Sequence, residues 1–203
     1  MNPNSHTPPA ERPKRFLDEN ELIQDAFRLG VMVYESGFRP NFIVGLWRGG
    51  SSIGIYVQEC LQTLGVETDH IALRTSYKGM HDYDAMVAAP DAKIRVHGTH
   101  YLLDNLNQDD RLLIVDDVFG SGHSIEAVLR RLRYQLKRNM PQDTRVATLY
   151  QRTGANRTEC KPDYCLHQTT DWLVFPYELN GLSRAEIDQH KPWLSPFLDG
   201  VKG

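Results

Sequence analysis

Residues 112–124 read LLIVDDVFGSGHS, and this stretch decides the fold class. The four apolar residues from Leu112 to Val115 are typical of a strand that is buried on both faces of a sheet. Two adjacent carboxylates and a short loop of small residues follow, and from Ile125 apolar residues recur at helical spacing up to Leu136. The stretch therefore predicts a buried strand, a tight loop and a helix, which is a typical unit of α/β proteins.

The loop and the carboxylates suit different parts of a sugar phosphate. Backbone N–H groups of residues 120–124 open the predicted helix and can converge on a phosphate, whose charge the helix dipole favours. Ser121 and Ser124 can add hydroxyl donors. Asp116 and Asp117 would repel a bare phosphate, but they can accept hydrogen bonds from ribose hydroxyls or hold Mg²⁺ nearby. The stretch thus predicts a site for a sugar that carries a phosphate.

Other interpretations of residues 112–124 fit less well. The Walker sequence GxxxxGK[ST] is absent, and the dinucleotide-binding fingerprint fails because Ile125 stands at its third glycine. A buried strand and turn that carried two carboxylates without a function would hold costly unpaired charge. The sugar phosphate site is therefore the favoured prediction.

Elements on both sides of this stretch extend the α/β pattern. Helical spacing predicts helices over 18–36 and around 53–64, and apolar runs predict strands at 41–47, 70–74, 145–150 and 164–168. Residues 75–110 are long and polar, with one strand-like piece at 93–96, and such a stretch is usually functional or mobile. Alternating strands and helices predict a parallel sheet covered on both faces, with ligands at the carboxyl ends of the strands.

Length and composition fit one domain of ordinary size. The chain has 203 residues, 40% of them hydrophobic, which is long enough for one core and short for two. We expect a disordered tail at 1–15 and a single domain over 16–203. A net charge of −3 argues against nucleic acid as a partner. The basic run from Arg130 to Arg138 interleaves with apolar helix positions, which favours a solvated helix face over an RNA site.

Cysteine usage and the N-terminus indicate the compartment. The three cysteines show neither the pairing pattern of a disulfide framework nor the spacing of a zinc site. The first residues lack the apolar stretch of a signal peptide, and no run of about 18 apolar residues occurs. We therefore expect a cytoplasmic protein without a membrane partner.

Residues 112–124 resemble a motif of the class I phosphoribosyltransferases, which bind phosphoribosyl pyrophosphate (PRPP). That motif has four apolar residues, two acidic, two apolar and then a small-residue loop. The resemblance implies an α/β fold with a parallel sheet of about five strands flanked by helices, a small hood and a flexible flap. It also implies that Asp116 and Asp117 contact the ribose hydroxyls or water bound to Mg²⁺. The residues implied for the 5′-phosphate are Gly120, Ser121, Gly122, His123 and Ser124.

Two more segments resemble loops of this family. Its first strand is followed by a pyrophosphate-binding loop, often RGG or KGG, whose leading peptide can be cis; here that peptide is Trp47–Arg48. Ser76 and Tyr77 resemble the Ser-Tyr pair that begins the flap over PRPP in 6-oxopurine members, where the flap shields the reaction from water. The residues implied for pyrophosphate are Arg48, Gly49 and Gly50.

Residues 171–178, DWLVFPYE, resemble the base-binding segment W-x-x-x-P-[WY]-[DE] of xanthine-guanine and related purine phosphoribosyltransferases. The resemblance implies that Trp172 stacks on the purine, that the backbone of Leu173 reads its edge, and that Glu178 lies near the 2-position or a metal. Aromatic faces and backbone polar groups suit a purine in this way. Arg152 stands where such enzymes have a Lys that donates to the purine O6, and a guanidinium can make the same donation.

One position departs from the 6-oxopurine pattern. The phosphate loop of those enzymes usually begins with an Asp that handles the proton on N7 of the base, whereas this chain has Gly120. The obvious general acid or base is therefore missing. His123 and Glu178 are candidates to replace it.

The sequence as a whole predicts a purine salvage enzyme that needs Mg²⁺. It would transfer the 5-phosphoribosyl group of PRPP to hypoxanthine, guanine or xanthine and release pyrophosphate, and by resemblance it would form a homodimer or homotetramer. The alternative is a regulator that senses PRPP or nucleotides on the same fold without catalysis. Gly120 favours this alternative, and the Ser-Tyr pair and residues 171–178 count against it.

Overall fold

A six-stranded sheet lies at the centre of the larger of two units in the computed structural model, which describes residues 14–77 and 94–200. Contacts assign Asn20–Thr170 to the larger unit, and the two ends of the chain, up to Glu19 and from Asp171, to the smaller one. Most of the expected tail at 1–15 and most of the expected flap lie outside the described residues. Lys14 and Arg15, which we expected in the tail, are in a strand.

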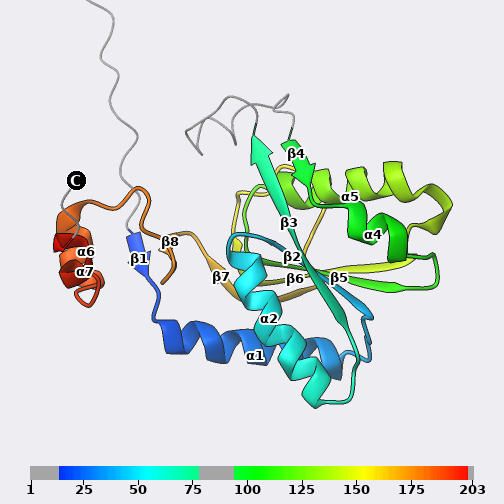
Figure 1. The fold of residues 1–203 in the computed structure, drawn as a ribbon, viewed down its shortest axis with the longest axis horizontal. Coiled ribbons are helices and arrows are strands. Elements are labelled where there is room, and N and C mark those ends of the chain that lie inside the picture. Colours follow the sequence, from blue (N-terminus) through cyan, green and yellow to red (C-terminus); the bar gives the residue numbers. More distant parts are fainter. Residues whose placement is uncertain (1–13, 78–93, 201–203) are drawn as a thin grey trace, which may run out of the picture. The chain divides into compact units, whose positions relative to one another are not determined.

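The described elements follow one another in the order drawn in Figure 1. They are β1 (Lys14–Phe16), α1 (Glu19–Glu35), β2 (Phe42–Trp47), α2 (Gly49–Thr63), β3 (Asp69–Tyr77), β4 (Ile94–His97), α4 (His100–Asn105), β5 (Arg111–Phe119), α5 (His123–Leu136), η1 (Lys137–Asn139), β6 (Asp143–Arg152), β7 (Tyr164–Thr169), β8 (Trp172–Val174), α6 (Arg184–His190) and α7 (Ser195–Asp199).

The large sheet has the strand order β4-β3-β2-β5-β6-β7. Strands β3, β2, β5, β6 and β7 are parallel, and β4 adds to β3 as an antiparallel edge strand. The predicted α/β architecture, with about five parallel strands, is confirmed. Since β2 and β5 are neighbours, the loops that follow them leave the same edge of the sheet.

Strand β5 shows why its sequence is apolar without interruption. Its residues 112–115 are all fully buried. Leu112 and Ile114 belong to a cluster with Val128 and Leu132 of α5, and because side chains alternate along a strand, Leu113 and Val115 face the opposite side. A central strand with helices on both faces needs apolar side chains at every position.

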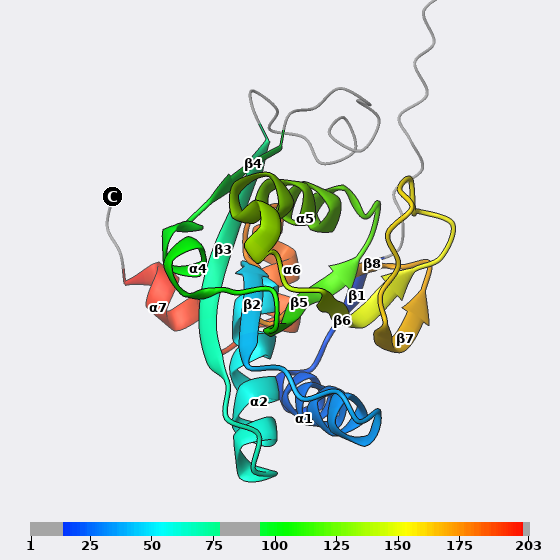
Figure 2. The same cartoon turned by 90° about the vertical axis from the view of Figure 1, so that its right-hand side faces the viewer.

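Helices cover both faces of the large sheet. Figures 1 and 2 show α1 and α2 along one face and α4 and α5 along the other. The first predicted helix is confirmed as α1, and the apolar residues that it buries are Leu22, Ala26, Leu29 and Val33, whereas Phe27 and Val31 are exposed. The basic residues between Arg130 and Arg138 are exposed, as a solvated helix face requires.

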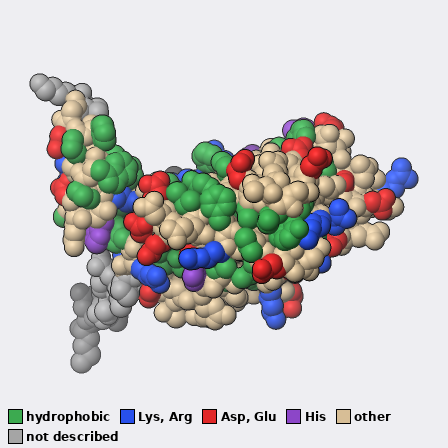
Figure 3. Space-filling model, turned by 90° about the horizontal axis from the view of Figure 1, so that it is seen from below, with side chains coloured by type: hydrophobic (Ala, Val, Ile, Leu, Met, Phe, Trp, Pro, Cys, Tyr) green, Lys and Arg blue, Asp and Glu red, His purple; other side chains and the backbone are tan. Residues whose placement is uncertain are grey.

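The side covered by α1 and α2 carries hydrophobic side chains among charged ones (Figure 3). Its exposed apolar residues include Phe27 and Val31 of α1 and Ile55 of α2. Phe27 also contacts Tyr56 of α2, with 5.6 Å between the ring centroids. Aromatic packing thus joins the two helices at their outer edge.

The smaller unit is built from both ends of the chain. Strands β1 and β8 form a parallel pair in which Lys14 lies opposite Trp172 and Phe16 opposite Val174. Helix α6 begins at Ser183 with a capping box, in which the Ser183 hydroxyl accepts from the Glu186 N–H and the Glu186 carboxylate accepts from the Ser183 N–H. None of the helices in the described part of the chain is both long enough and apolar enough to cross a membrane.

Candidate functional site

The loop between β5 and α5 forms a cavity at the carboxyl end of β5. This places a hollow where the sequence predicted the phosphate loop. The residues that line it are Asp116, Val118, Phe119, Gly120, Ser121, Gly122, Ser124 and Ile125.

The two carboxylates that we expected at the end of the buried strand lie within β5, which continues to Phe119, and they are not equivalent. Asp116 lines the cavity, and its Oδ1 accepts a hydrogen bond from the Asp117 N–H at 3.0 Å. Asp117 is not among the lining residues, and its Oδ1 accepts from the Val118 N–H at 2.8 Å. The two carboxyl groups are nevertheless close enough to share a hydrogen bond, which helps to raise the pKa of Asp116.

Asp116 holds its proton more tightly than an ordinary carboxyl group. Burial raises the pKa of Asp116 well above its usual range, and the negative charge of Asp117 raises it further. Positive charge or hydroxyl donors beside this pair would favour the ionised form. A ligand with ribose hydroxyls, or a cation, would therefore stabilise the ionised form of Asp116 in the cavity.

The phosphate loop turns into α5 at Gly122, which precedes the helix with φ of 83°. Only glycine adopts this left-handed conformation readily. The Gly122 carbonyl accepts the Glu126 N–H at 3.0 Å, and the hydroxyl of the buried Ser121 accepts the His123 N–H at 3.4 Å. Gly122, Ser124 and Ile125 at the start of α5 line the cavity, which therefore lies at the helix end that favours anions.

The predicted pyrophosphate loop follows β2, and its peptide Trp47–Arg48 is cis. Arg48 is exposed and precedes α2, while Gly49 and Gly50 are buried in the first turn of that helix. A Cβ atom added to Gly50 would overlap the carbonyl oxygen of Val115 and lie 2.8 Å from Cα of Asp116. Gly50 therefore packs directly on the backbone of β5 at Val115 and Asp116, the residue whose carboxylate lines the cavity.

The expected start of the flap lies at the end of β3. The Ser76 hydroxyl and Nε2 of His97 are 2.9 Å apart, so β4 contacts this residue. Tyr77 is the last residue of β3. The other flap residues fall within 78–93, outside the described residues.

The predicted base-binding residues fall into both units. Arg152 is the last residue of β6 in the larger unit, beside Thr169 of β7. Trp172 and Leu173 form part of β8 in the smaller unit. Glu178 closes a turn there, because its N–H donates to the Phe175 carbonyl at 3.0 Å and its Oε2 accepts the Phe175 N–H at 3.0 Å.

Two further residues that contact predicted site segments gave no signal in the sequence. Lys191, at the end of α6, is 5% exposed, and its Nζ donates to the carbonyls of Phe175 and Pro176 at 3.0 and 2.7 Å. Thr158 lies against Gly122 of the phosphate loop. A buried Lys is unusual, but nothing in a linear sequence marks it as buried.

The donor set fits Mg²⁺ only in part. Asp116 and Asp117 supply the carboxylate oxygens that Mg²⁺ prefers. In the described residues no group of three or more His, Cys, Asp or Glu side chains could hold a metal ion by itself. This suits an ion that keeps several waters and completes its shell with phosphate oxygens of a substrate.

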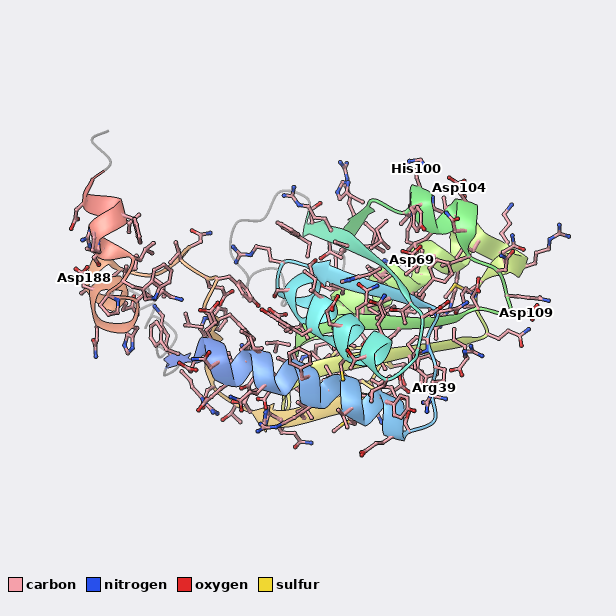
Figure 4. All side chains as sticks on the ribbon, turned by 60° about the horizontal axis from the view of Figure 1, so that its bottom comes forward. Arg39, Asp69, His100, Asp104, Asp109 and Asp188 are labelled. Carbon is pink, nitrogen blue, oxygen red and sulfur yellow. The ribbon has the colours of Figure 1, made fainter. Side chains whose placement is uncertain are left out.

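A second hollow lies away from this cavity, near the start of β5. Figure 4 shows Asp109 at that end of the larger unit, together with Arg39. The hollow is polar and open, and its position at the amino ends of the strands is not where α/β proteins bind their ligands. Its lining residues are Asn107, Gln108, Asp109, Asp110, Arg138 and Asn139.

Comparison with solved structures gives many matches, although no protein-family model and no curated protein matches the chain. A purine phosphoribosyltransferase from Pyrococcus horikoshii is 22% identical with a TM-score of 0.62, covering 84% of this chain and 97% of its own. The xanthine-guanine-hypoxanthine phosphoribosyltransferase of Helicobacter pylori is 20% identical with a TM-score of 0.59, covering 83% and 95%. A hypothetical protein from Neisseria gonorrhoeae with bound ppGpp is 16% identical with a TM-score of 0.68, covering 92% and 98%.

These likenesses show that the chain has the class I phosphoribosyltransferase fold. Within that class, several of the similar structures are hypoxanthine or xanthine-guanine phosphoribosyltransferases. The 6-oxopurine branch is also the one that residues 171–178 resemble.

Proposed function

We propose that the chain transfers the 5-phosphoribosyl group of PRPP to a purine base in purine salvage, with hypoxanthine, guanine or xanthine as the substrate. One observation carries the proposal. The cavity joins the Asp116 carboxylate to the amides that open α5, and Gly50 of the loop after β2 packs against the same end of β5. A single ligand with a ribose between two phosphate groups matches this arrangement.

Each part of PRPP has a chemical partner in the larger unit. The 5′-phosphate accepts hydrogen bonds from the N–H groups of residues 120–124, where the dipole of α5 favours its charge. Asp116 and Asp117 accept from the ribose 2′- and 3′-hydroxyls. Arg48 and the N–H groups at the start of α2 bind the pyrophosphate.

The reaction breaks the bond between C1′ and the pyrophosphate oxygen, and both bonding electrons leave with pyrophosphate. Positive charge develops on the ribose ring, and the carboxylates of Asp116 and Asp117 stabilise it. Arg48 stabilises the charge on the leaving pyrophosphate. Asp116 and Asp117 would hold Mg²⁺ through water, and the bound ion would neutralise further charge on the leaving group. A ring nitrogen of the purine then bonds to C1′, and a proton leaves the base.

The proposed base contacts are those that the resemblance of residues 171–178 and of Arg152 implies. Trp172 stacks on the purine, the Leu173 backbone reads its edge, and Arg152 donates to O6. Glu178 lies near the 2-position or a metal, although one of its carboxylate oxygens already accepts the Phe175 N–H. His123 and Glu178 remain the candidates for the proton that Asp handles in related enzymes, since Gly120 has no side chain to do so.

The direct test is release of pyrophosphate from Mg²⁺-PRPP with a panel of purine and pyrimidine bases. We expect release with at least one 6-oxopurine and none without a base. Asp117→Asn should lower turnover by about 100-fold or more, because one stabilising charge is removed from the transition state. No release with any base, or full turnover in Asp117→Asn, would contradict the proposal.

A nucleotide-sensing regulator is the second candidate. Two observations favour it: the similar Neisseria gonorrhoeae structure contains ppGpp, and this chain has Gly120 in place of the usual Asp. A guanosine nucleotide with pyrophosphate groups shares phosphate and ribose chemistry with PRPP. Binding of ppGpp measured by calorimetry, together with no pyrophosphate release from PRPP and any base, would favour the regulator over the enzyme.

A further inference from the structure

A polar turn of residues 156–160, between β6 and β7, packs against the phosphate loop. The Arg157 N–H donates to the Ser121 carbonyl at 2.9 Å. A Cβ atom added to Gly122 would overlap Oγ1 of Thr158 and lie 3.0 Å from Oδ1 of Asn156. Residues more than thirty positions away in the sequence therefore contact the two central residues of the phosphate loop.

Hydrogen bonds within the turn fix its shape. Oδ1 of Asn156 accepts from the N–H and the hydroxyl of Thr158 at 2.9 and 3.1 Å. Nδ2 of Asn156 donates to the Cys160 carbonyl at 2.8 Å, and the Cys160 N–H donates to the Thr158 hydroxyl at 3.3 Å. The Asn156 and Thr158 side chains thus bond to each other and to both backbone groups of Cys160, so neither can move without breaking several bonds.

The bond from Arg157 sets the direction of one amide in the phosphate loop. The Ser121 carbonyl and the Gly122 N–H belong to one peptide group, and in a trans peptide these two groups point in opposite directions. Because the carbonyl points at the turn, the Gly122 N–H points away from it. Gly122 lines the cavity and has a left-handed conformation. A side chain at Gly122 would overlap the turn of residues 156–160.

We propose that Asn156 and Thr158 are positioning residues for the 5′-phosphate. They hold the turn of residues 156–160 so that the Arg157 N–H orients the Ser121–Gly122 peptide and directs the Gly122 N–H at the phosphate. This inference rests on the proposed binding of PRPP in the same cavity. It assigns a role in substrate binding to a segment that carries no motif and no charge beyond Arg157 and Glu159.

Thr158 offers a matched pair of variants. Thr158→Val has nearly the same shape but loses the hydroxyl that donates to Asn156 and accepts from Cys160, whereas Thr158→Ser keeps it. Ribose 5-phosphate probes the phosphate loop and the carboxylates, and inorganic pyrophosphate with Mg²⁺ probes the loop after β2. Both affinities can be measured by calorimetry on the full chain, with thermal melts to check folding.

We expect Thr158→Val to weaken ribose 5-phosphate binding about tenfold, the equivalent of one hydrogen bond. Thr158→Ser should stay within about twofold of the unmodified chain, and pyrophosphate affinity should be unchanged in both variants. In turnover assays Thr158→Val should raise the KM for PRPP more than the KM for the base.

Four other outcomes are possible, and each has a different consequence for the proposal. Unchanged ribose 5-phosphate affinity in Thr158→Val would overturn the positioning role and leave the proposed function intact. An equal loss of both affinities would have the same consequence, because it would indicate a general structural effect. If the unmodified chain binds neither probe, the proposed function itself fails. If Thr158→Val does not fold, Asn156→Ala replaces it, because it removes the acceptor for Thr158 and the donor to Cys160 without adding a charge. Asn156→Ala should also weaken ribose 5-phosphate binding selectively, and unchanged affinity would overturn the role.

Discussion

The carbonyl oxygen of Val115 occupies the space where a side chain at Gly50 would begin. Gly50 lies in the first turn of α2 and Val115 in the middle of β5. The contact brings the loop that follows β2 onto the strand that carries Asp116, and it does so through backbone atoms alone. The φ of Gly50 is not positive, so its backbone conformation does not require glycine. Glycine is required because any side chain would overlap the backbone of β5.

Gly50→Ala should therefore destabilise the protein. Since Val115 and Asp116 belong to the central strand, the added methyl group has to displace α2, which should cost about 1–3 kcal/mol in the free energy of unfolding. Urea unfolding measures this change. Gly200→Ala is the control, because Gly200 lies at the end of α7 with its nearest contacts at 3.7 Å, and it should change stability by less than about 0.5 kcal/mol. Equal stability of the two variants would refute the close approach.

Asp116→Asn should stabilise the ligand-free protein near neutral pH. The pKa of Asp116 is raised in the folded state, so its stabilising contribution is complete below the unfolded pKa near 3.8 and is lost as pH rises through the folded pKa. Above that point the buried charge beside Asp117 destabilises the fold. An amide has no charge to bury, and we expect a higher Tm than that of the unmodified chain around pH 7.5, with a difference that shrinks toward pH 4.

Thermal unfolding without Mg²⁺ or PRPP over this pH range tests the effect, and Asp109→Asn provides the same change at an exposed site. Pyrophosphate release should fall in Asp116→Asn even as Tm rises. A Tm below that of the unmodified chain at every pH would show that the Asp116 carboxylate is stabilising, against the pKa argument.

Long periodic elements were predictable from the sequence. Helix α1 and strand β2 lie within one residue of their predicted ranges, because each has enough apolar residues to establish a pattern. Strand β5 begins one residue before the predicted start at Leu112 but continues to Phe119, beyond the two carboxylates that we expected at its end. Strand β3 extends to Tyr77, beyond the predicted end at Arg74, since its last residues pair with β4 although they are polar. The apolar pattern of a sequence does not indicate whether a strand pairs with an edge strand.

Short elements and contacts between distant residues were not predictable. Helices α4, α6 and α7 have seven residues or fewer, which is too short for helical spacing to appear. Strand β1 forms only because β8, from the other end of the chain, pairs with it. Likewise, nothing around Asn156 predicts that its turn meets Gly122, because that contact depends on the parallel course of β5 and β6.

The bond between Lys14 and Glu186 should be measurable by titration. The Lys14 Nζ lies 2.7 Å from Oε1 of Glu186 and, with the two bonds from Ser183, lowers the pKa of Glu186 to about 2. Lys14→Ala should raise this pKa toward 4.5, but not to it, because the bonds from Ser183 remain. NMR of the carboxyl carbon measures the pKa directly. Arg15→Ala, at the neighbouring exposed position, should leave it near 2.

The same bond predicts acid sensitivity of the smaller unit. Because the folded pKa of Glu186 is depressed, the stability that it contributes is present above the unfolded pKa of 4.5 and is lost as pH falls toward 2. Chemical shifts of the α6 backbone should therefore change over this range in the unmodified chain. In Lys14→Ala the change should begin at higher pH, and identical profiles would mean that Lys14 does not contribute.

Lys191→Met should impair the proposed base site without unfolding the protein. Burial lowers the pKa of Lys191, because a charged ammonium group is unfavourable there. Removing this charge offsets the loss of the hydrogen bonds to Phe175 and Pro176, so the free energy of unfolding should change by no more than about 2 kcal/mol. The two carbonyls then lose the donor that holds the turn before Glu178. We expect the KM for the purine to rise about tenfold while the KM for PRPP is unchanged, as loss of one such bond implies. Gln189→Met, on the exposed side of α6, is the control and should alter neither KM. Equal KM values for Lys191→Met and the unmodified chain would show that the turn keeps its shape without the lysine.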